Sequence, residues 1–277
     1  MISGKTTLIA HIGYPTEAFK APLIYNPWFD SKGIDAVVVP MGVKAEDFPE
    51  SLKQIFKFTN LRGALVTMPH KVTTMSLADD ATITAKIAGA ANALLKREDG
   101  TLLADQFDGA GFARGVARKG FKTKGSKILV VGTGGVGSPI AASLAADGAA
   151  SISLFDLNTA SAEGLASRLK QYYPDMEVNV TSNDPAGYDM VVNATPLGMK
   201  DSDPLPFDPT RLSPSTFVGE VVMKNEITPI LKAAKELGCQ YQVGTDMLFE
   251  MIPAYLEFFG FGTATPDELR AVAKISY

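Results

Sequence analysis

Short apolar runs alternate with longer amphipathic segments along the 277-residue chain. β-Branched or apolar runs indicate buried strands, and apolar positions spaced three and four apart indicate helices. The pattern predicts strands over 5–12, 36–40, 63–67, 127–131, 151–155, 190–193 and 217–222. It predicts helices over 21–32, from about 45, and over 109–120, 136–147 and 160–172, with a helical C-terminal part from 246 onward. Strands separated by helices favour parallel pairing, so we expect an α/β fold.

Two further segments bear on the organisation of the domains. The runs 90–96 and 101–105 flank Asp99-Gly100, a turn sequence that predicts a hairpin at the edge of a sheet. The polar, basic segment 121–126 is interpreted as a linker, because the strand–helix alternation restarts after it. We predict one α/β domain over 1–106, on which C-terminal helices from 245–277 pack back, and a second domain over 107–244.

Composition narrows the class of protein. Hydrophobic residues make up 46% and charged residues 20%, which is typical of a soluble folded chain. A net charge of −4 supplies no positive field for nucleic acid, and no apolar run approaches the roughly 20 residues of a membrane span. One cysteine and two histidines exclude an intrachain disulfide and argue against a zinc site, so no metal is expected. Without a signal sequence, we expect a cytoplasmic enzyme.

A glycine-rich loop is the most informative segment. The apolar strand over 127–131 leads into G-x-G-x-x-G, formed by Gly132, Gly134 and Gly137, and an amphipathic helix follows. In this context the first glycine permits a tight turn, the second lets a pyrophosphate approach, and the third allows close helix–strand packing. The helix N-terminus offers N–H groups to phosphates, so Gly135 and Val136 belong to the same predicted cofactor site. The alternative is a glycine-rich turn with no ligand.

Asp156 predicts which dinucleotide binds. It ends the second strand of this domain, where a carboxylate accepts hydrogen bonds from the ribose hydroxyls of NAD and repels the 2′-phosphate of NADP. Leu157 and Asn158 supply no cation to offset that repulsion. We therefore predict NAD as the preferred cofactor; the alternative is that Asp156 only caps the following turn.

Lys71 and Asp108 are candidates for proton transfer. Lys71 follows the strand over 63–67, and glycines leave space around Asp108. Brought together by the fold, an ammonium and a carboxylate could share a substrate hydroxyl, one transferring its proton and the other orienting it. The alternative for Lys71 is a solvated surface charge. For the histidines we expect a structural role for His70 and a satisfied position in or beside the core for His11.

Several motifs occur in one order along nearly the whole chain. They are Gly13-Tyr-Pro15, T-x-P-x-K over 67–71, Gly89-Ala-Ala-Asn92, D-G-x-G-F over 108–112, the glycine loop, N-A-T-P-L-G-M over 193–199, and G-x-x-M-L over 244–248. Through them the chain resembles the shikimate/quinate dehydrogenase family. The resemblance implies a substrate-binding catalytic domain, 1–106 with 245–277, a Rossmann domain, 107–244, and a cleft between them.

The resemblance also implies roles for individual residues. Lys71 and Asp108 would be the catalytic pair, and Asn92 and Thr67 would bind the substrate, a polyhydroxylated cyclohexene or cyclohexane carboxylate. Further residues would line the cofactor site: Asn193, Thr195, Pro196, Leu197, Gly198, Met199 and Gly244.

The chain departs from the family pattern where the substrate carboxylate is held. Phe19 and Ala21 replace the two serines of S-x-S-P, Met223 replaces a tyrosine, and Met251 replaces a glutamine. Because these side chains cannot donate the lost hydrogen bonds, we predict that shikimate is a poor substrate. For Phe19 the alternative is a core residue without a role in specificity.

The sequence thus predicts an NAD-dependent oxidoreductase for a ring secondary alcohol related to shikimate, quinate or aminoshikimate. Two alternatives stay open: an oxidoreductase for an unrelated, less acidic alcohol, and a non-catalytic NAD-binding protein. The expected partner is a small-molecule substrate, with neither nucleic acid nor membrane involved. The oligomeric state is left open, a homodimer being compatible with the sequence.

Overall fold

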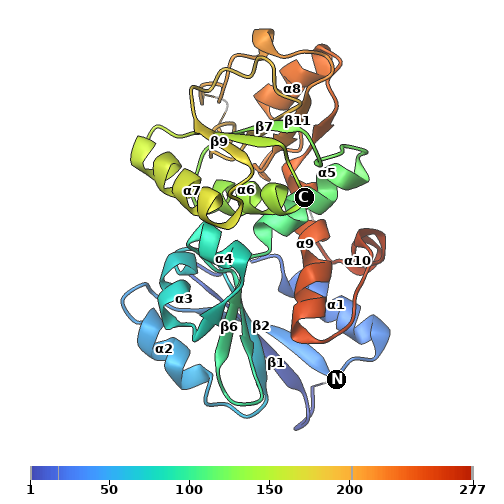
Figure 1. The fold of residues 1–277 in the computed structure, drawn as a ribbon. Coiled ribbons are helices and arrows are strands. Elements are labelled where there is room, and N and C mark those ends of the chain that lie inside the picture. The colour runs from blue at the N-terminus through green and yellow to red at the C-terminus, as the bar shows by residue number, and fades with distance from the viewer. Residues whose placement is uncertain (1, 18, 201, 276–277) are drawn as a thin grey trace. The chain divides into compact units, whose positions relative to one another are not determined.

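The chain forms two compact units (Figure 1). The computed structural model describes residues 2–17, 19–200 and 202–275. The first unit comprises residues 1–107 with 252–277, and the second comprises residues 108–251. The sequence-based boundary at 244/245 falls at the start of helix α9 (Gly244–Phe259), whereas the two units divide within this helix, after Met251.

The first unit is built on a six-stranded sheet ordered β2-β1-β3-β5-β6-β4. Its strands are β1 (Thr7–Gly13), β2 (Ala36–Gly42), β3 (Leu61–Val66), β4 (Asp80–Ala81), β5 (Ala93–Lys96) and β6 (Leu102–Asp105). The first three run parallel, so their carboxyl ends share one edge of the sheet. The predicted hairpin is present as antiparallel β5 and β6, but the two-residue β4 forms the outermost strand.

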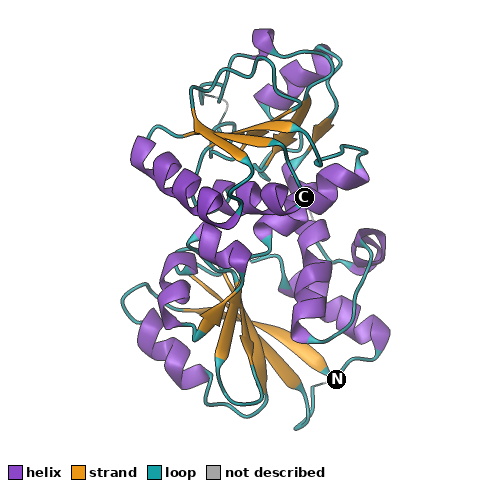
Figure 2. Cartoon of the chain, viewed as in Figure 1, coloured by secondary structure: helices purple, strands orange, loops and turns teal. Residues whose placement is uncertain are grey.

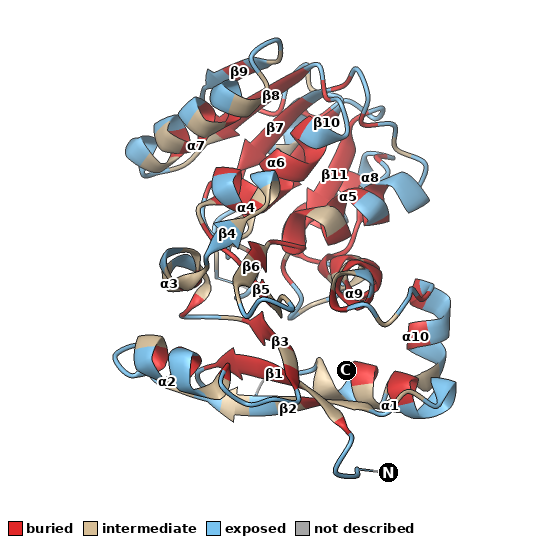
Figure 3. Cartoon of the chain, turned by 60° about the horizontal axis from the view of Figure 1, so that its bottom comes forward, coloured by how far each residue is buried: buried red, intermediate tan, exposed pale blue. Residues whose placement is uncertain are grey.

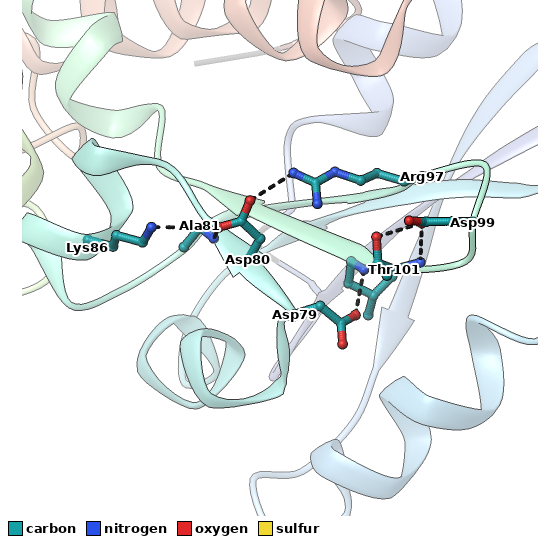
Figure 4. Close-up of polar contacts among 8 residues, drawn as sticks. Asp79, Asp80, Ala81, Lys86, Arg97, Asp99 and Thr101 are labelled. Atoms are coloured by element: carbon teal, nitrogen blue, oxygen red, sulfur yellow. Dashed lines mark hydrogen bonds and ion pairs between the residues drawn. The ribbon is translucent and has the colours of Figure 1, made fainter.

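Polar contacts stabilise the hairpin and the short edge strand (Figure 4). Asp99 Oδ1 accepts hydrogen bonds from the backbone N and the hydroxyl of Thr101, which closes the turn. Asp80 pairs with Arg97 at 2.9 Å and with Lys86 at 3.6 Å. These groups lower the pKa of Asp80, the Arg97 hydrogen bond having the largest effect, but the carboxylate is exposed and its pairs contribute little to stability.

Helices cover both faces of this sheet. They are α1 (Pro22–Lys32), α2 (Phe48–Ile55), α3 (Lys71–Leu77), α4 (Ile83–Ala88), the C-terminal part of α9 and α10 (Pro266–Val272). On one face, Ala10 and Ile12 of β1 belong to a cluster with Phe48 and Leu52 of α2. Alternation along the strand therefore directs Ile9 and His11 to the other face.

The C-terminal helices pack back on the first unit, as predicted. Phe259 lies against Gly63 of β3, where an added Cβ would come within 2.5 Å of its ring. The Phe261 ring contacts Phe29 of α1 at a centroid distance of 5.0 Å, and Lys32 pairs with Glu268 of α10 at 3.0 Å. Burial of these apolar rings, more than the exposed ion pair, holds the segment in place.

The second unit is a parallel sheet ordered β12-β11-β10-β7-β8-β9. Its strands are β7 (Lys127–Val131), β8 (Ser151–Phe155), β9 (Glu177–Val180), β10 (Met190–Asn193), β11 (Phe217–Glu220) and β12 (Tyr241–Gln242). Figure 3 shows the central strands buried, as a parallel sheet covered on both faces requires. The strand order reverses between β7 and β10, and such switch points bind ligands at the carboxyl ends of the strands.

Helices lie on both faces of this second sheet (Figure 2). They are α5 (Asp108–Arg118), α6 (Gly137–Ala146), α7 (Thr159–Tyr172), α8 (Pro229–Glu236) and the 3₁₀ turn η1 (Pro209–Arg211). α5 and α6 cross closely because Gly109 has no side chain: an added Cβ would overlap the carbonyl of Pro139. The predicted α/β architecture is therefore confirmed.

Short elements account for most of the differences from the sequence-based prediction. Strands β4, β9 and β12 and helices α4 and α8 were not predicted; each has eight residues or fewer. The linker 121–126 joins α5 to β7 within the second unit and does not separate the two units. None of the helices in the described ranges has the length and apolar character needed to cross a bilayer.

Candidate functional site

The glycine loop between β7 and α6 has the geometry of a phosphate cradle. Gly132 has φ of +99°, and an added Cβ would lie 2.8 Å from the backbone of Ala194, so this position requires glycine. At Gly137 a Cβ would overlap the carbonyl of Gly132, which confirms close helix–strand packing. Gly134 and Gly135 are exposed, and an added Cβ there would meet nothing within 4 Å. The N-terminus of α6 thus opens on space that a pyrophosphate could occupy.

Asp156 is tied to this loop. Its Oδ2 accepts hydrogen bonds from the N and the hydroxyl of Thr133, at 2.7 and 3.0 Å, and its Oδ1 accepts one from Asn158 N at 2.9 Å. Burial raises the pKa of Asp156, but these hydrogen bonds outweigh burial and leave the pKa below its ordinary value. The turn-capping contact of the alternative interpretation is present, and the carboxylate is also fixed beside the glycine loop. The next side chain, Leu157, is 94% exposed.

The loop after β10 is shaped by Asn193. Its fully buried side chain donates from Nδ2 to Leu197 O at 3.0 Å and to both oxygens of Glu220, and its Oδ1 accepts from Thr195. These contacts occupy the Asn193 amide, so this residue shapes the predicted cofactor loop from within. Pro196 and Met199 are exposed on that loop.

Two glycines, Gly198 and Gly244, shape the backbone that follows strands β10 and β12. Gly198 has φ of +101°, and its N donates to Asp203 Oδ2 at 3.1 Å. Gly244 lies directly against the carbonyl of Val222, so a side chain there would overlap the backbone that follows β11. Both glycines are required by close approach or backbone conformation.

Glu220, which the sequence analysis missed, organises the end of β11. The carboxylate is fully buried and accepts hydrogen bonds from Val221 N, Val222 N and Thr228 Oγ1, at 2.7 to 3.0 Å, in addition to Asn193. Burial raises the pKa of Glu220, and these donors partly offset that effect. A carboxylate directly after a buried strand, at the carboxyl edge of a parallel sheet, was the available signal.

In the first unit, Lys71 and Asn92 lie on neighbouring segments. Lys71 is the first residue of α3, and its carbonyl accepts a hydrogen bond from Ala91 N at 2.9 Å. Asn92 is 1% exposed, and its Oδ1 accepts from Phe107 N at 2.9 Å. Three segments therefore meet at one edge of the sheet: the end of β3, the loop before β5, and the segment around Phe107 that leads into α5. Asp108 is buried and opens α5 in the second unit, where a helix N-terminus stabilises a carboxylate.

His70 has the structural role that was expected. Its ring stacks on Phe48 at a centroid distance of 4.0 Å, and its Nε2 lies 2.9 Å from Val43 O. Burial lowers its pKa, and the Val43 contact opposes this. His70 thus anchors the start of α3, which carries Lys71.

Phe19 lies in a cluster of side chains at the carboxyl ends of β1 and β3. Its ring stacks on the imidazole of His11, with centroids 4.0 Å apart. A Cβ added to Gly13 would overlap Thr67 and lie 2.9 Å from the Phe19 ring, so these three residues meet. Ala21 is the N-cap of α1 and makes no side-chain capping bond. The two positions where the family pattern has serines therefore present no hydroxyl donor.

His11 differs from expectation. It is nine-tenths buried, yet its Nδ1 has no hydrogen-bond partner among the described residues, so the prediction of a satisfied histidine is wrong. The residues that pair with His11 on the neighbouring strands, Pro40 and Leu65, have no polar side chain, which the sequence of one strand could not reveal.

The two methionines at predicted substrate positions belong to the second unit. Met223 follows β11 and is 36% exposed. Met251 lies on α9, where its Cβ is 2.6 Å from the position of a Cβ added to Gly111 of α5. Gly111 thus allows α5 and α9 to pack closely. In the described ranges no three His, Cys, Asp or Glu side chains are grouped so as to hold a metal.

Comparison with known proteins decides the family. A family model described as the shikimate dehydrogenase substrate binding domain matches residues 11–94. The curated protein named shikimate dehydrogenase (NADP(+)) from Rubrobacter xylanophilus is 33% identical over 251 residues, covering 89% of this chain and 88% of the relative. The chain belongs to the shikimate dehydrogenase family. This confirms the resemblance inferred from the ordered motifs.

Two solved structures have the same fold as this chain, and their names give different substrates. Shikimate 5-dehydrogenase from Listeria monocytogenes, in complex with shikimate and NAD, has a TM-score of 0.91 at 27% identity, covering 98% of this chain and 97% of that one. The 5-ketofructose reductase of Gluconobacter sp. strain CHM43 has a TM-score of 0.88 at 25% identity, covering 98% and 99%. The fold and the class, a shikimate dehydrogenase-type oxidoreductase that uses a nicotinamide cofactor, are thereby established.

Proposed function

We propose that this chain is an NAD-dependent dehydrogenase that oxidises a ring secondary alcohol related to shikimate, quinate or aminoshikimate, with shikimate itself a poor substrate. The first unit would bind the alcohol, since the matching family model describes a substrate binding domain. The second unit would bind the dinucleotide at the glycine loop, whose exposed Gly134 and Gly135 leave the approach open.

Lys71 and Asp108 would carry the proton transfer. A bound nicotinamide dinucleotide would supply the acceptor for the hydride of the carbon that bears the hydroxyl. The Lys71 amine and the Asp108 carboxylate would hold that hydroxyl between them, and one of the two would accept its proton. Asn92, fixed by Phe107 N, would orient a neighbouring hydroxyl, and Thr67 would border the ring.

The preference for NAD rests on Asp156. Its carboxylate is held beside the glycine loop, and its lowered pKa keeps it ionised at neutral pH. An anion at this place accepts hydrogen bonds from a ribose diol and repels a 2′-phosphate. Leu157 and Asn158 bring no compensating cation.

One observation carries the altered specificity: the Phe19 ring stacks on His11 where the family pattern has a serine. A hydrogen bond from a neutral donor to a carboxylate is worth about 1.5–3 kcal/mol. Without two such donors, binding of a carboxylate weakens by roughly 3–6 kcal/mol, or two to four orders of magnitude.

A second candidate is an oxidoreductase for a neutral polyol or keto sugar. The similarity to a 5-ketofructose reductase favours it, because that protein's substrate by name is a sugar ketone without a carboxylate. The same apolar Phe19 contact suits this candidate equally.

Steady-state kinetics with NAD and NADP on shikimate, quinate and 5-ketofructose would test the proposal. We expect NAD to be used more efficiently than NADP, low kcat/KM for shikimate, and loss of turnover in Lys71→Ala. The double variant Phe19→Ser/Ala21→Ser should raise kcat/KM for shikimate by at least about tenfold, since it returns two hydroxyl donors.

The single variants Phe19→Ser and Ala21→Ser are the component controls, and each should give only part of the gain because it returns one of the two hydroxyl donors. Preferred use of NADP, or efficient shikimate turnover by the unaltered protein, would overturn the proposal.

A further inference from the structure

His11 is a polar side chain at a position that packing alone does not explain. It lies in β1, a strand whose other side chains are apolar except Thr7, and its buried Nδ1 has no partner among the described residues. Burying a polar atom without a partner is unfavourable. A β-branched aliphatic residue would fill this strand position without that penalty, so the imidazole has a use beyond the core.

The location of His11 suggests that use. His11 and Gly13 point to the same face of the sheet because side chains alternate along a strand. On that face, the Cβ direction of Gly13 leads to Thr67 and to Phe19, which stacks on His11. This cluster lies at the carboxyl ends of parallel strands β1 and β3, the edge at which α/β sheets bind ligands.

The buried, unpaired Nδ1 also indicates where the imidazole carries its proton. An unpaired acceptor is tolerated in a protein interior more readily than an unpaired N–H, so the proton belongs on Nε2. Burial lowers the pKa of His11 to about 4, so only about one molecule in a thousand carries a charge on this ring at pH 7. His11 is therefore a neutral N–H donor.

We propose that His11 determines specificity by donating its Nε2–H to an uncharged oxygen of the substrate. This inference rests on the proposed function and narrows its substrate class to alcohols that are uncharged at the end next to Phe19: a hydroxyl, carbonyl or ester in place of a carboxylate. The stacked Phe19 ring fixes the plane of the imidazole. A neutral imidazole N–H brings no charge that would compensate the desolvation of a carboxylate.

Shikimate and its methyl ester form a matched pair of probes, because they share the ring hydroxyls and differ in charge. We expect the unaltered protein to use the ester with kcat/KM at least about tenfold above that for the acid. His11→Val should lower kcat/KM for the ester about tenfold, mainly through KM, as expected for the loss of one neutral hydrogen bond, and should leave the KM for NAD unchanged.

Trp28→Phe is a matched control. Trp28, on α1 of the first unit, also carries a buried nitrogen without a hydrogen-bond partner in the part of the chain that the structure describes. Its replacement should leave the ratio of ester to acid unchanged. A preference for the acid that is lost in Lys20→Ala would overturn the proposal, because a cation would then be holding a carboxylate.

Nitrogen NMR gives a readout that is independent of turnover. The chain has two histidines, so His11→Val assigns both imidazoles directly. We expect the Nε2-protonated, neutral form of His11 at pH 7 and a shift of its Nε2 resonance when methyl shikimate is added with NAD. An Nδ1-protonated ring, or no shift at saturating ester, would overturn the proposal.

The outcomes separate this inference from the proposed function. Turnover that depends on Lys71, together with an ester-to-acid ratio unaffected by His11→Val, would remove only the role of His11. Absence of any Lys71-dependent turnover would remove the proposed function, and the NMR titration would still decide whether His11 contacts the ester.

Discussion

At the scale of single residues, His11 links stability to pH. Its folded pKa of about 4 lies below the ordinary 6.5, so between these values the unfolded chain takes up a proton that the folded chain does not. The free energy of unfolding therefore decreases as the pH falls below 6.5. His11 lowers it by about 1.4 kcal/mol per pH unit, up to roughly 3 kcal/mol near pH 4. Above pH 6.5 this contribution is fully present.

His11→Val should flatten that dependence. Urea unfolding of both proteins at pH 7, 5.5 and 4.5 measures it, and the difference between the two curves cancels the carboxyl groups that titrate in the same range. As the pH falls from 7 to 4.5, we expect the free energy of unfolding to decrease less in the variant than in the parent, by about 1 kcal/mol or more. Parallel curves would show that His11 is protonated without cost in the folded state.

The carboxylate of Asp156 has two possible roles that its position in the sequence does not separate. The sequence predicted a carboxylate at the end of β8, and the structure places one there with bonds to both Thr133 and Asn158. Its three hydrogen bonds leave about one of the roughly four lone-pair positions of the carboxylate for a ribose hydroxyl, so capping the turn does not exclude the proposed cofactor role.

At the scale of elements, Glu220 joins the ends of β10 and β11. Glu220→Ala leaves Asn193, Val221, Val222 and Thr228 without their buried acceptor. We expect the free energy of unfolding to fall by at least about 3 kcal/mol, since each abandoned donor costs about 1 kcal/mol or more. NAD should also bind more weakly, because Asn193 then no longer fixes the loop over 195–199. Chemical denaturation and a binding titration measure the two effects.

Glu236→Ala is the control for this prediction. Glu236 is exposed at the end of α8 in the same unit, so its removal should change stability by no more than about 0.5 kcal/mol. Equal stability of the Glu220 and Glu236 variants would contradict the organising role of Glu220.

At the scale of the whole molecule, the chain contains two units, each with its own buried cluster. A ligand that binds one folded unit stabilises that unit by mass action, by about 2.7 kcal/mol at a hundred times its Kd. In scanning calorimetry we therefore expect NAD to raise the unfolding temperature of the second unit. NADP at the same concentration should raise it less, because in the proposed preference for NAD the Asp156 carboxylate repels the 2′-phosphate. Equal shifts with the two cofactors would contradict the assigned preference.

The sequence by itself determined the features that are encoded within one strand, turn and helix. The glycine loop is such a feature: Gly132 and Gly137 are required by a turn and a packing contact only a few residues long, so their spacing predicted their conformation. The sequence also identified the family, because the family's motifs occur in order along the chain. The buried strands β7 and β8, of five residues each, were predicted to the residue for the same reason.

Only the tertiary structure decided which distant side chains meet. Nothing in the pattern of β1 shows that Phe19 covers His11 or that Nδ1 lacks a partner, and nothing near Asn193 shows that its amide is held by Glu220. Such contacts depend on how strands align and on which side chains fill the space between them, and these are set by burial over the whole unit rather than by local preference.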